Sequence, residues 1–121
     1  MHELSVAQSL IELVEAQLRD EPSYVGVTSV HVRVGRMSGV VPAALRSSFP
    51  VAAAGTRLDG ARLEVEQVAL VVWCAQCERE QTLDGPVRLR CPTCGVPTPD
   101  VRTGRELDVA TVELSDRPPK S

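Results

Sequence analysis

Residues 74–95 read CAQCEREQTLDGPVRLRCPTCG and contain all four cysteines of this 121-residue chain. The cysteines form two pairs, Cys74-x2-Cys77 and Cys91-x2-Cys94, with 13 residues between the pairs. A Cys-x2-Cys step turns two thiolates toward one ion, and two such steps supply the four sulfurs of a closed tetrahedral shell. The spacing therefore predicts a structural Zn²⁺ site with no open position for water.

Two other uses of these cysteines stay open. Iron in a rubredoxin-like electron carrier would use the same four sulfurs. Two disulfides would suit an oxidising compartment, but the first residues show neither the basic patch nor the apolar segment of a secretory signal. We therefore expect a cytoplasmic protein with reduced cysteines, and we favour zinc.

Upstream of the cysteines, the chain alternates between helical and strand periodicity. Apolar residues recur at helical spacing over 4–18, where Leu10 and Leu13 widen the stripe formed by Leu4, Ala7, Ile11, Val14 and Leu18. Period-two alternation over 25–34 and 62–67 predicts two strands. The apolar residues 68–73 read as a connector to the cysteine region.

A second helix is predicted over residues 43–54, with Leu45, Phe49 and Ala53 on its apolar side. Pro42 suits the first helical position, whereas Pro50 lacks an N–H group inside the helix. We therefore expect a kink or an early stop near residues 46–48.

Downstream, residues 74–104 are rich in proline and glycine and are expected to be mainly loops with little core, whereas 107–114 return to strand character. The predicted fold is α+β: a three-stranded sheet with two helices, plus an inserted zinc-ribbon-like module between the second and third strands. Residues 1–70 and 106–116 would form one discontinuous domain, residues 71–105 the zinc-binding domain, and residues 117–121 a frayed tail.

Composition argues against several functions. The formal net charge is −3, and the only aromatic residues are Tyr24, Phe49 and Trp73, so the chain lacks both the basic footprint and the stacking platform of a nucleic-acid binder. Its longest apolar run, residues 68–75, is far short of the roughly 18 residues of a membrane span. No nucleophilic triad or carboxylate pair stands out, so an enzyme is not expected.

His2 suggests a second metal site. The α-amine, the His2 amide and the imidazole can close fused chelate rings, and such nitrogen-rich sets suit Ni(II) or Cu(II) better than Zn²⁺. The first amides of a helix have no internal acceptor, so they are available to a metal. The alternative is an exposed histidine without a role. The only other histidine, His31, is expected on the polar face of the first strand.

Several segments together resemble the HypA/HybF family of hydrogenase nickel-incorporation metallochaperones. The similarity covers residues 2–114 in order, including the paired cysteine motifs. Its other segments are MHELS at 1–5, VGRMSGV at 34–40, GTRLDGARLEV at 55–65 and GREL at 104–107.

The resemblance implies a nickel-binding α+β domain carrying a zinc-ribbon-like insertion. It implies that nickel is held by His2 together with backbone nitrogens of His2 and Glu3, and zinc by Cys74, Cys77, Cys91 and Cys94. It also implies delivery of nickel to the large subunit of a [NiFe] hydrogenase, with a maturation GTPase as partner. Some relatives also serve urease, and the assembly would be a monomer or a homodimer.

The chain departs from the family pattern at two places. Val40, Val41 and Ala44 stand where relatives often carry a carboxylate before the second helix, and Pro50 interrupts a helix that relatives usually continue without it. The alternative function is a zinc-ribbon interaction module for nucleic acid or transcription proteins, in which Arg79, Arg88 and Arg90 would contact phosphates.

Overall fold

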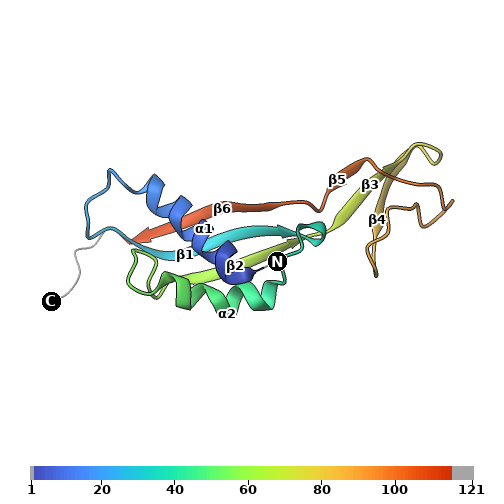
Figure 1. Ribbon diagram of the computed structural model, residues 1–121. Helices are drawn as coiled ribbons and strands as arrows, with labels where there is room; N and C mark the ends of the chain where they lie inside the picture. The colour runs from blue at the N-terminus through green and yellow to red at the C-terminus, as the bar shows by residue number, and fades with distance from the viewer. Residues whose placement is uncertain (1, 116–121) are drawn as a thin grey trace.

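The computed structural model describes residues 2–115, and the predicted tail at 117–121 lies outside them. The described chain forms two three-stranded sheets arranged end to end, with both α-helices on the first sheet (Figure 1). In chain order the elements are α1 (Glu3–Gln17), β1 (Gly26–Gly35), the 3-10 turn η1 (Arg36–Ser38), α2 (Pro42–Ala53), β2 (Arg62–Val68), β3 (Leu70–Cys74), β4 (Arg79–Leu83), β5 (Val101–Thr103) and β6 (Leu107–Ser115).

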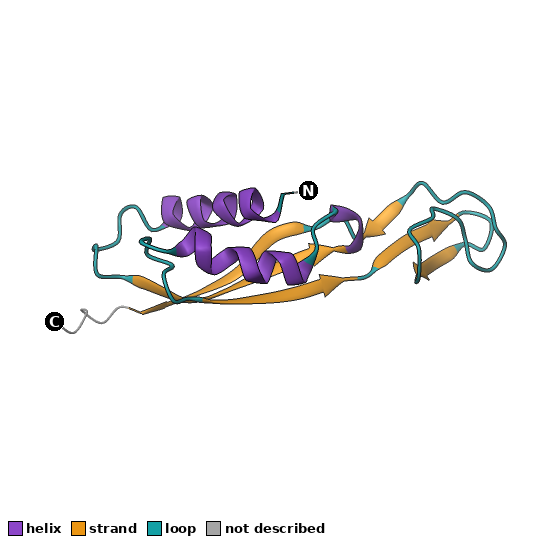
Figure 2. Cartoon of the chain, turned by 60° about the horizontal axis from the view of Figure 1, so that its bottom comes forward, coloured by secondary structure: helices purple, strands orange, loops and turns teal. Residues whose placement is uncertain are grey.

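The first sheet, called here the helix-covered sheet, has the strand order β2-β1-β6. Strand β1 pairs parallel with β2 and antiparallel with β6. The parallel pair requires a crossover, which α2 supplies. Helices α1 and α2 lie side by side on one face of this sheet (Figure 2).

The core of the helix-covered sheet is almost entirely aliphatic. Alternate β1 residues Val30, Val32 and Val34 are almost fully buried. They meet the buried faces of α1 and α2, where Phe49 is the one aromatic in the cluster. Every second residue of a strand faces the same side, and every third or fourth residue of a helix does so, which is why these positions meet in the core.

The second sheet, called here the cysteine-bearing sheet, has the order β4-β3-β5, with both pairs antiparallel. The prediction that residues 68–73 form only a connector was wrong, because Leu70–Cys74 is the central strand β3. Its alternate residues Leu70, Val72 and Cys74 are fully buried, while its other face is half-buried. An apolar run covered on both sides hides the alternation that identifies a strand.

Two details of the helices also differ from expectation. Helix α2 continues to Ala53 instead of stopping near 46–48, with Pro50 exposed on its outer side and Phe49 and Ala53 buried on the inner side. The burial of Phe49 and Ala53, on either side of Pro50, stabilises the helix by more than the missing Pro50 hydrogen bond destabilises it. In α1, Leu4 and Leu13 of the predicted apolar stripe are 42% and 47% exposed.

The structure confirms the predicted α+β fold. Strands β1, β2 and β6 form one sheet, and both helices cover one of its faces. The cysteine-bearing sheet is inserted in the chain between β2 and β6. The region 74–104 does contain two short strands, but its core is small: only Leu70, Val72 and Leu83 make up the buried cluster of this sheet.

Candidate metal centre

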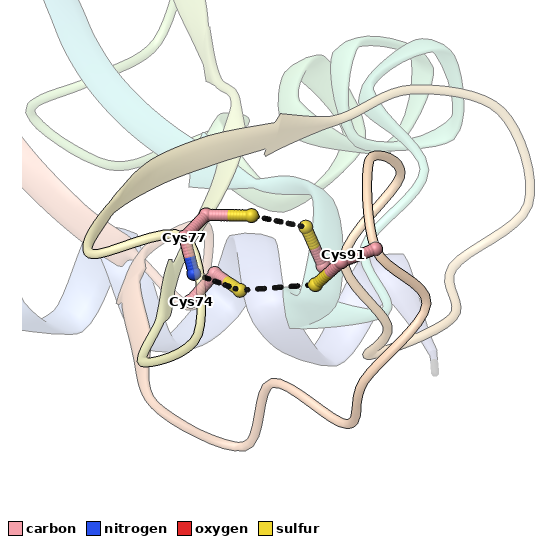
Figure 3. Close-up of side chains that lie close together, drawn as sticks. Cys74, Cys77 and Cys91 are labelled. Atoms are coloured by element: carbon pink, nitrogen blue, oxygen red, sulfur yellow. Dashed lines mark hydrogen bonds between the residues drawn. The ribbon is translucent and has the colours of Figure 1, made fainter.

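The structure brings the four cysteines together at the end of the cysteine-bearing sheet (Figure 3). Their Sγ atoms all lie within 4.8 Å of one another, and all four cysteines are free thiols. The Sγ–Sγ distances are 3.5 Å for Cys74–Cys94 and 3.9 Å for Cys77–Cys91. A tetrahedral ion with bonds of about 2.3 Å to sulfur has edges of about 3.8 Å, so the arrangement fits Zn²⁺.

Backbone geometry explains why these side chains converge. In each pair a backbone N–H donates to the sulfur of the first cysteine: Cys77 N to Cys74 Sγ at 3.3 Å, and Thr93 N to Cys91 Sγ at 3.4 Å. The residue after each pair, Glu78 or Gly95, has a positive φ, of 53° and 79°. Glycine adopts a positive φ without steric cost, so the conformation of Gly95 could be predicted from its residue type. Glu78 carries a Cβ atom and adopts a positive φ at a steric cost.

The cysteines differ in their affinity for protons. A hydrogen bond with Cys94 and then burial raise the pKa of Cys77 to about 12. Burial alone would raise the pKa of Cys91, but hydrogen bonds with the backbone of Cys94 and Thr93 and with neighbouring thiols lower that pKa to about 6. For Cys94, a hydrogen bond with the Val96 backbone opposes burial and the Cys74 thiol, which prevail and raise the pKa. The lowered pKa favours the thiolate form of Cys91, which is the form that binds a metal.

His2 lies in a different part of the molecule from the cysteines, at the start of α1 (Figure 1). It is exposed and extended, with φ −83° and ψ 102°, and its side chain makes no capping hydrogen bond to the helix. Its carbonyl accepts the first helical bond, from Val6 N at 3.2 Å. The imidazole is thus exposed at the start of the helix and has no capping role.

Glu3 opens α1 and places an acidic group in its first turn. Its Oε2 atom is shielded from solvent and meets no hydrogen-bond partner within residues 2–115. A negative charge at this position complements the positive end of the helix dipole and offsets the repulsion that a cation would meet there. The backbone N–H of Glu3 is among the four that a helix leaves without an internal acceptor.

The remaining residues singled out from the sequence lie elsewhere. His31 is half-buried on the uncovered face of the helix-covered sheet, in register with Glu64 and Thr111. Val40 is buried in the core, whereas Val41 is 54% exposed. Neither valine offers a donor atom to a metal.

Two of the three arginines of the alternative nucleic-acid interface make hydrogen bonds within the protein, and the third, Arg88, is exposed. Arg79 donates to Thr93 Oγ1 at 3.4 Å, and Arg90 donates to the Gly95 carbonyl at 3.1 Å. The Trp73 ring is covered by the Arg102 guanidinium, 5.0 Å from the ring centroid. The one aromatic beside the cysteines is thus occupied on that face and presents no stacking platform there.

The paired cysteines, the two-sheet fold and the helix that begins at His2 can be compared with known proteins. The family model described as "Hydrogenase/urease nickel incorporation, metallochaperone, hypA" matches residues 1–114. The chain belongs to the HypA family. It is therefore a member of a family of nickel-incorporation metallochaperones and maturation factors, a class that is not catalytic.

Curated HypA relatives match over nearly their whole length. A "Hydrogenase maturation factor HypA" from a Roseiflexus species is 45% identical over 121 residues, covering 100% of this chain and 98% of that protein. The protein of the same name from Streptomyces avermitilis is 42% identical over 116 residues, covering 96% and 88%. The resemblance noted from the sequence is confirmed.

Solved HypA structures share the fold. The solution structure of the Ni metallochaperone HypA from Helicobacter pylori superimposes with a TM-score of 0.65 at 22% identity, covering 94% of this chain and 97% of that chain. A second solution structure of a HypA protein gives a TM-score of 0.67 at 21% identity, covering 97% and 98%. No helix within residues 2–115 is long and apolar enough to cross a membrane.

Proposed function

We propose that this HypA-family chain binds Ni(II) at its N-terminus and delivers it during maturation of a [NiFe] hydrogenase. In this proposal the His2 imidazole and the backbone nitrogens of His2 and Glu3 hold the nickel. Cys74, Cys77, Cys91 and Cys94 hold a structural Zn²⁺. The observation that carries the proposal is the exposed His2 at the start of α1, with no capping hydrogen bond to compete for its side chain.

Exposure suits a site that must release its metal. A delivered ion leaves by ligand exchange, so an incoming ligand from the acceptor must be able to approach it. His2 is open to solvent, whereas two of the four cysteines are buried. Nitrogen ligands also favour Ni(II) over harder cations, in contrast to the all-sulfur cluster.

The zinc proposal rests on the sulfur geometry and on the size of the surrounding core. The four thiolates would complete the coordination shell and leave no position for a substrate, so the ion would serve structure. Structural zinc contributes on the order of 10–16 kcal/mol in small modules. The three buried apolar residues of the cysteine-bearing sheet are a small core, which zinc would supplement.

We further propose that the chain has two domains, residues 1–70 with 106–116 for nickel and residues 71–105 for zinc. Its partners would be the hydrogenase maturation GTPase and the hydrogenase large subunit in the cytoplasm, with urease maturation proteins as further partners. Acting as a monomer or homodimer, it would need neither nucleic acid nor a membrane. The family description names both hydrogenase and urease, which supports partners from the maturation of these two enzymes.

The experiment is a nickel titration of the purified, zinc-loaded wild type beside His2→Ala, with His31→Ala as the matched control. We expect one nickel per chain in the wild type and in His31→Ala, and loss of that binding in His2→Ala. Elemental analysis should give one zinc per chain in all three proteins. Equal nickel affinity in His2→Ala and the wild type would refute the assignment of His2.

A further inference from the structure

The two sheets are joined covalently at a narrow waist. Ala69 alone separates β2 from β3, and residues 104–106 separate β5 from β6. These two connections lie against each other, because Thr103 Oγ1 donates to the Ala69 carbonyl at 2.8 Å. Two adjacent connections act as one hinge, so by themselves they leave the cysteine-bearing sheet free to swing about the waist.

A third attachment comes from η1, the turn that joins β1 to α2. Figure 2 shows this turn at the end of the helix-covered sheet that faces the cysteine-bearing sheet. Arg36 of η1 donates from Nη1 to the Leu83 carbonyl at 2.5 Å and from Nη2 to the Gly85 carbonyl. Both acceptors lie at the end of β4, more than 45 residues away along the chain.

The neighbouring residue, Met37, contacts the same sheet in two ways. Its backbone N–H donates to the Gly104 carbonyl at 2.7 Å. Its side chain packs against the small apolar core formed by Leu70, Val72 and Leu83. Arg36 thus reaches the outer strand β4, while Met37 closes the space next to the waist.

Strand β4 is the edge strand beside β3, and its Leu83 pairs with Leu70, the residue after Ala69, so the Arg36 contacts lie one strand to the side of the hinge. A hinge with an additional attachment off its axis cannot rotate until that attachment breaks. Hydrogen bonds from a charged donor are stronger than neutral ones, and a guanidinium can hold two carbonyls at once because its donors form a rigid fork.

We propose that Arg36 is a positioning residue that holds the cysteine-bearing sheet in one orientation relative to the helix-covered sheet. The residue belongs to neither core: it is exposed, and it lies between β1 and α2 while both its acceptors lie beyond β3. Loss of its side chain leaves only the Met37 contacts beside the waist, so the hinge gains freedom to rotate while each sheet stays folded. The inference goes beyond the proposed nickel chemistry and does not depend on His2.

The test uses NMR residual dipolar couplings of the ¹⁵N-labelled, zinc-loaded full chain, which report the orientation of each N–H bond. In the wild type, one alignment tensor is expected to fit both the helix-covered sheet and the cysteine-bearing sheet. In Arg36→Ala, each sheet should still fit its own structure but require a separate tensor, with averaged couplings in the cysteine-bearing sheet. Arg36→Lys, which keeps the charge but loses the fork, should lie between the two.

Arg33→Ala is the matched control. Arg33 is an arginine on the preceding strand β1, and the one polar contact of its side chain within residues 2–115 is an exposed ion pair with Glu66, at 3.3 Å, in the helix-covered sheet. The couplings of the Arg33→Ala protein should still fit one alignment tensor for both sheets. A common tensor in Arg36→Ala, or the same loss in Arg33→Ala, would overturn the proposal.

A measurement on the wild type does not depend on any variant folding. Scalar couplings across hydrogen bonds should connect the Arg36 guanidinium to the Leu83 and Gly85 carbonyls, and rotation about its terminal bonds should be slow. The Arg33 guanidinium should show neither effect. Fast rotation at Arg36 without such couplings would equally refute its role.

Discussion

The two sheets of this protein are stabilised by different means. The helix-covered sheet buries fourteen apolar residues in one cluster beneath two helices, whereas the cysteine-bearing sheet buries three. In place of a large apolar core, the cysteine-bearing sheet has four cysteine sulfur atoms that lie close together. The helix-covered sheet is thus stabilised by burial, whereas the proposed zinc would stabilise the cysteine-bearing sheet, so each sheet should unfold under a different perturbation.

The largest expected effect is loss of the metal. Cys91→Ser removes one of the four proposed zinc ligands and should unfold residues 74–104 while the helix-covered sheet stays folded, since a structural zinc supplies on the order of 10–16 kcal/mol. In a ¹H–¹⁵N spectrum, the resonances of β4 and β5 should collapse while those of β1 and α2 remain dispersed. Thr93→Ser, which keeps the thiolates, is the control. Loss of the far-UV helical signal in Cys91→Ser would contradict the separation.

The reciprocal change lies in the larger core. Phe49 is 1% exposed and is the one aromatic in that cluster, so Phe49→Ala should lower the free energy of unfolding by about 3–5 kcal/mol. Chemical denaturation followed by circular dichroism measures it. Zinc content should remain one per chain, because the cysteines do not contact this core. A parallel loss of zinc under native conditions would show that the two sheets fold as one unit.

Metal affinity of the cysteine cluster should depend on pH. At neutral pH, Cys77 and Cys94 hold their protons, since their pKa values are raised, while Cys91 is mainly thiolate because its pKa is about 6. A metal replaces these protons, so the affinity should rise with pH, and more protons should be released below pH 6, where Cys91 is also protonated, than near pH 7. Calorimetric zinc titrations in buffers of different ionisation enthalpy count the protons. A binding heat independent of the buffer would contradict this pattern.

The smallest effect concerns the strained residue after the first cysteine pair. Glu78 has a φ of 53°, whereas the equivalent position after the second pair is glycine. Glu78→Gly should stabilise the cysteine-bearing sheet by about 0.5–1 kcal/mol, because glycine takes this conformation without a Cβ clash. Competition with a chelator should show slightly tighter zinc retention. Glu80→Gly, on the adjacent strand, should weaken retention instead.

The sequence predicted what depends on local pattern. Residues 3–17 became a helix because their apolar positions recur every three to four residues, and 26–35 became a strand because Val30, Val32 and Val34 alternate. The cysteine cluster was also predictable, because a Cys-x2-Cys step converges its own sulfurs and the pairs are unique in the chain. The role of His2 remains a prediction, since spacing cannot show which metal binds there.

Only the tertiary structure determined how distant segments meet. Leu70–Cys74 reads as an apolar connector until β4 and β5 pair with its two edges, and α2 passes Pro50 because Phe49 and Ala53 are buried on either side of it. The contacts of Arg36 with Leu83 and Gly85 have no local signal at all. Periodicity reports the environment of one segment, whereas pairing and orientation depend on which segments the folded chain brings together.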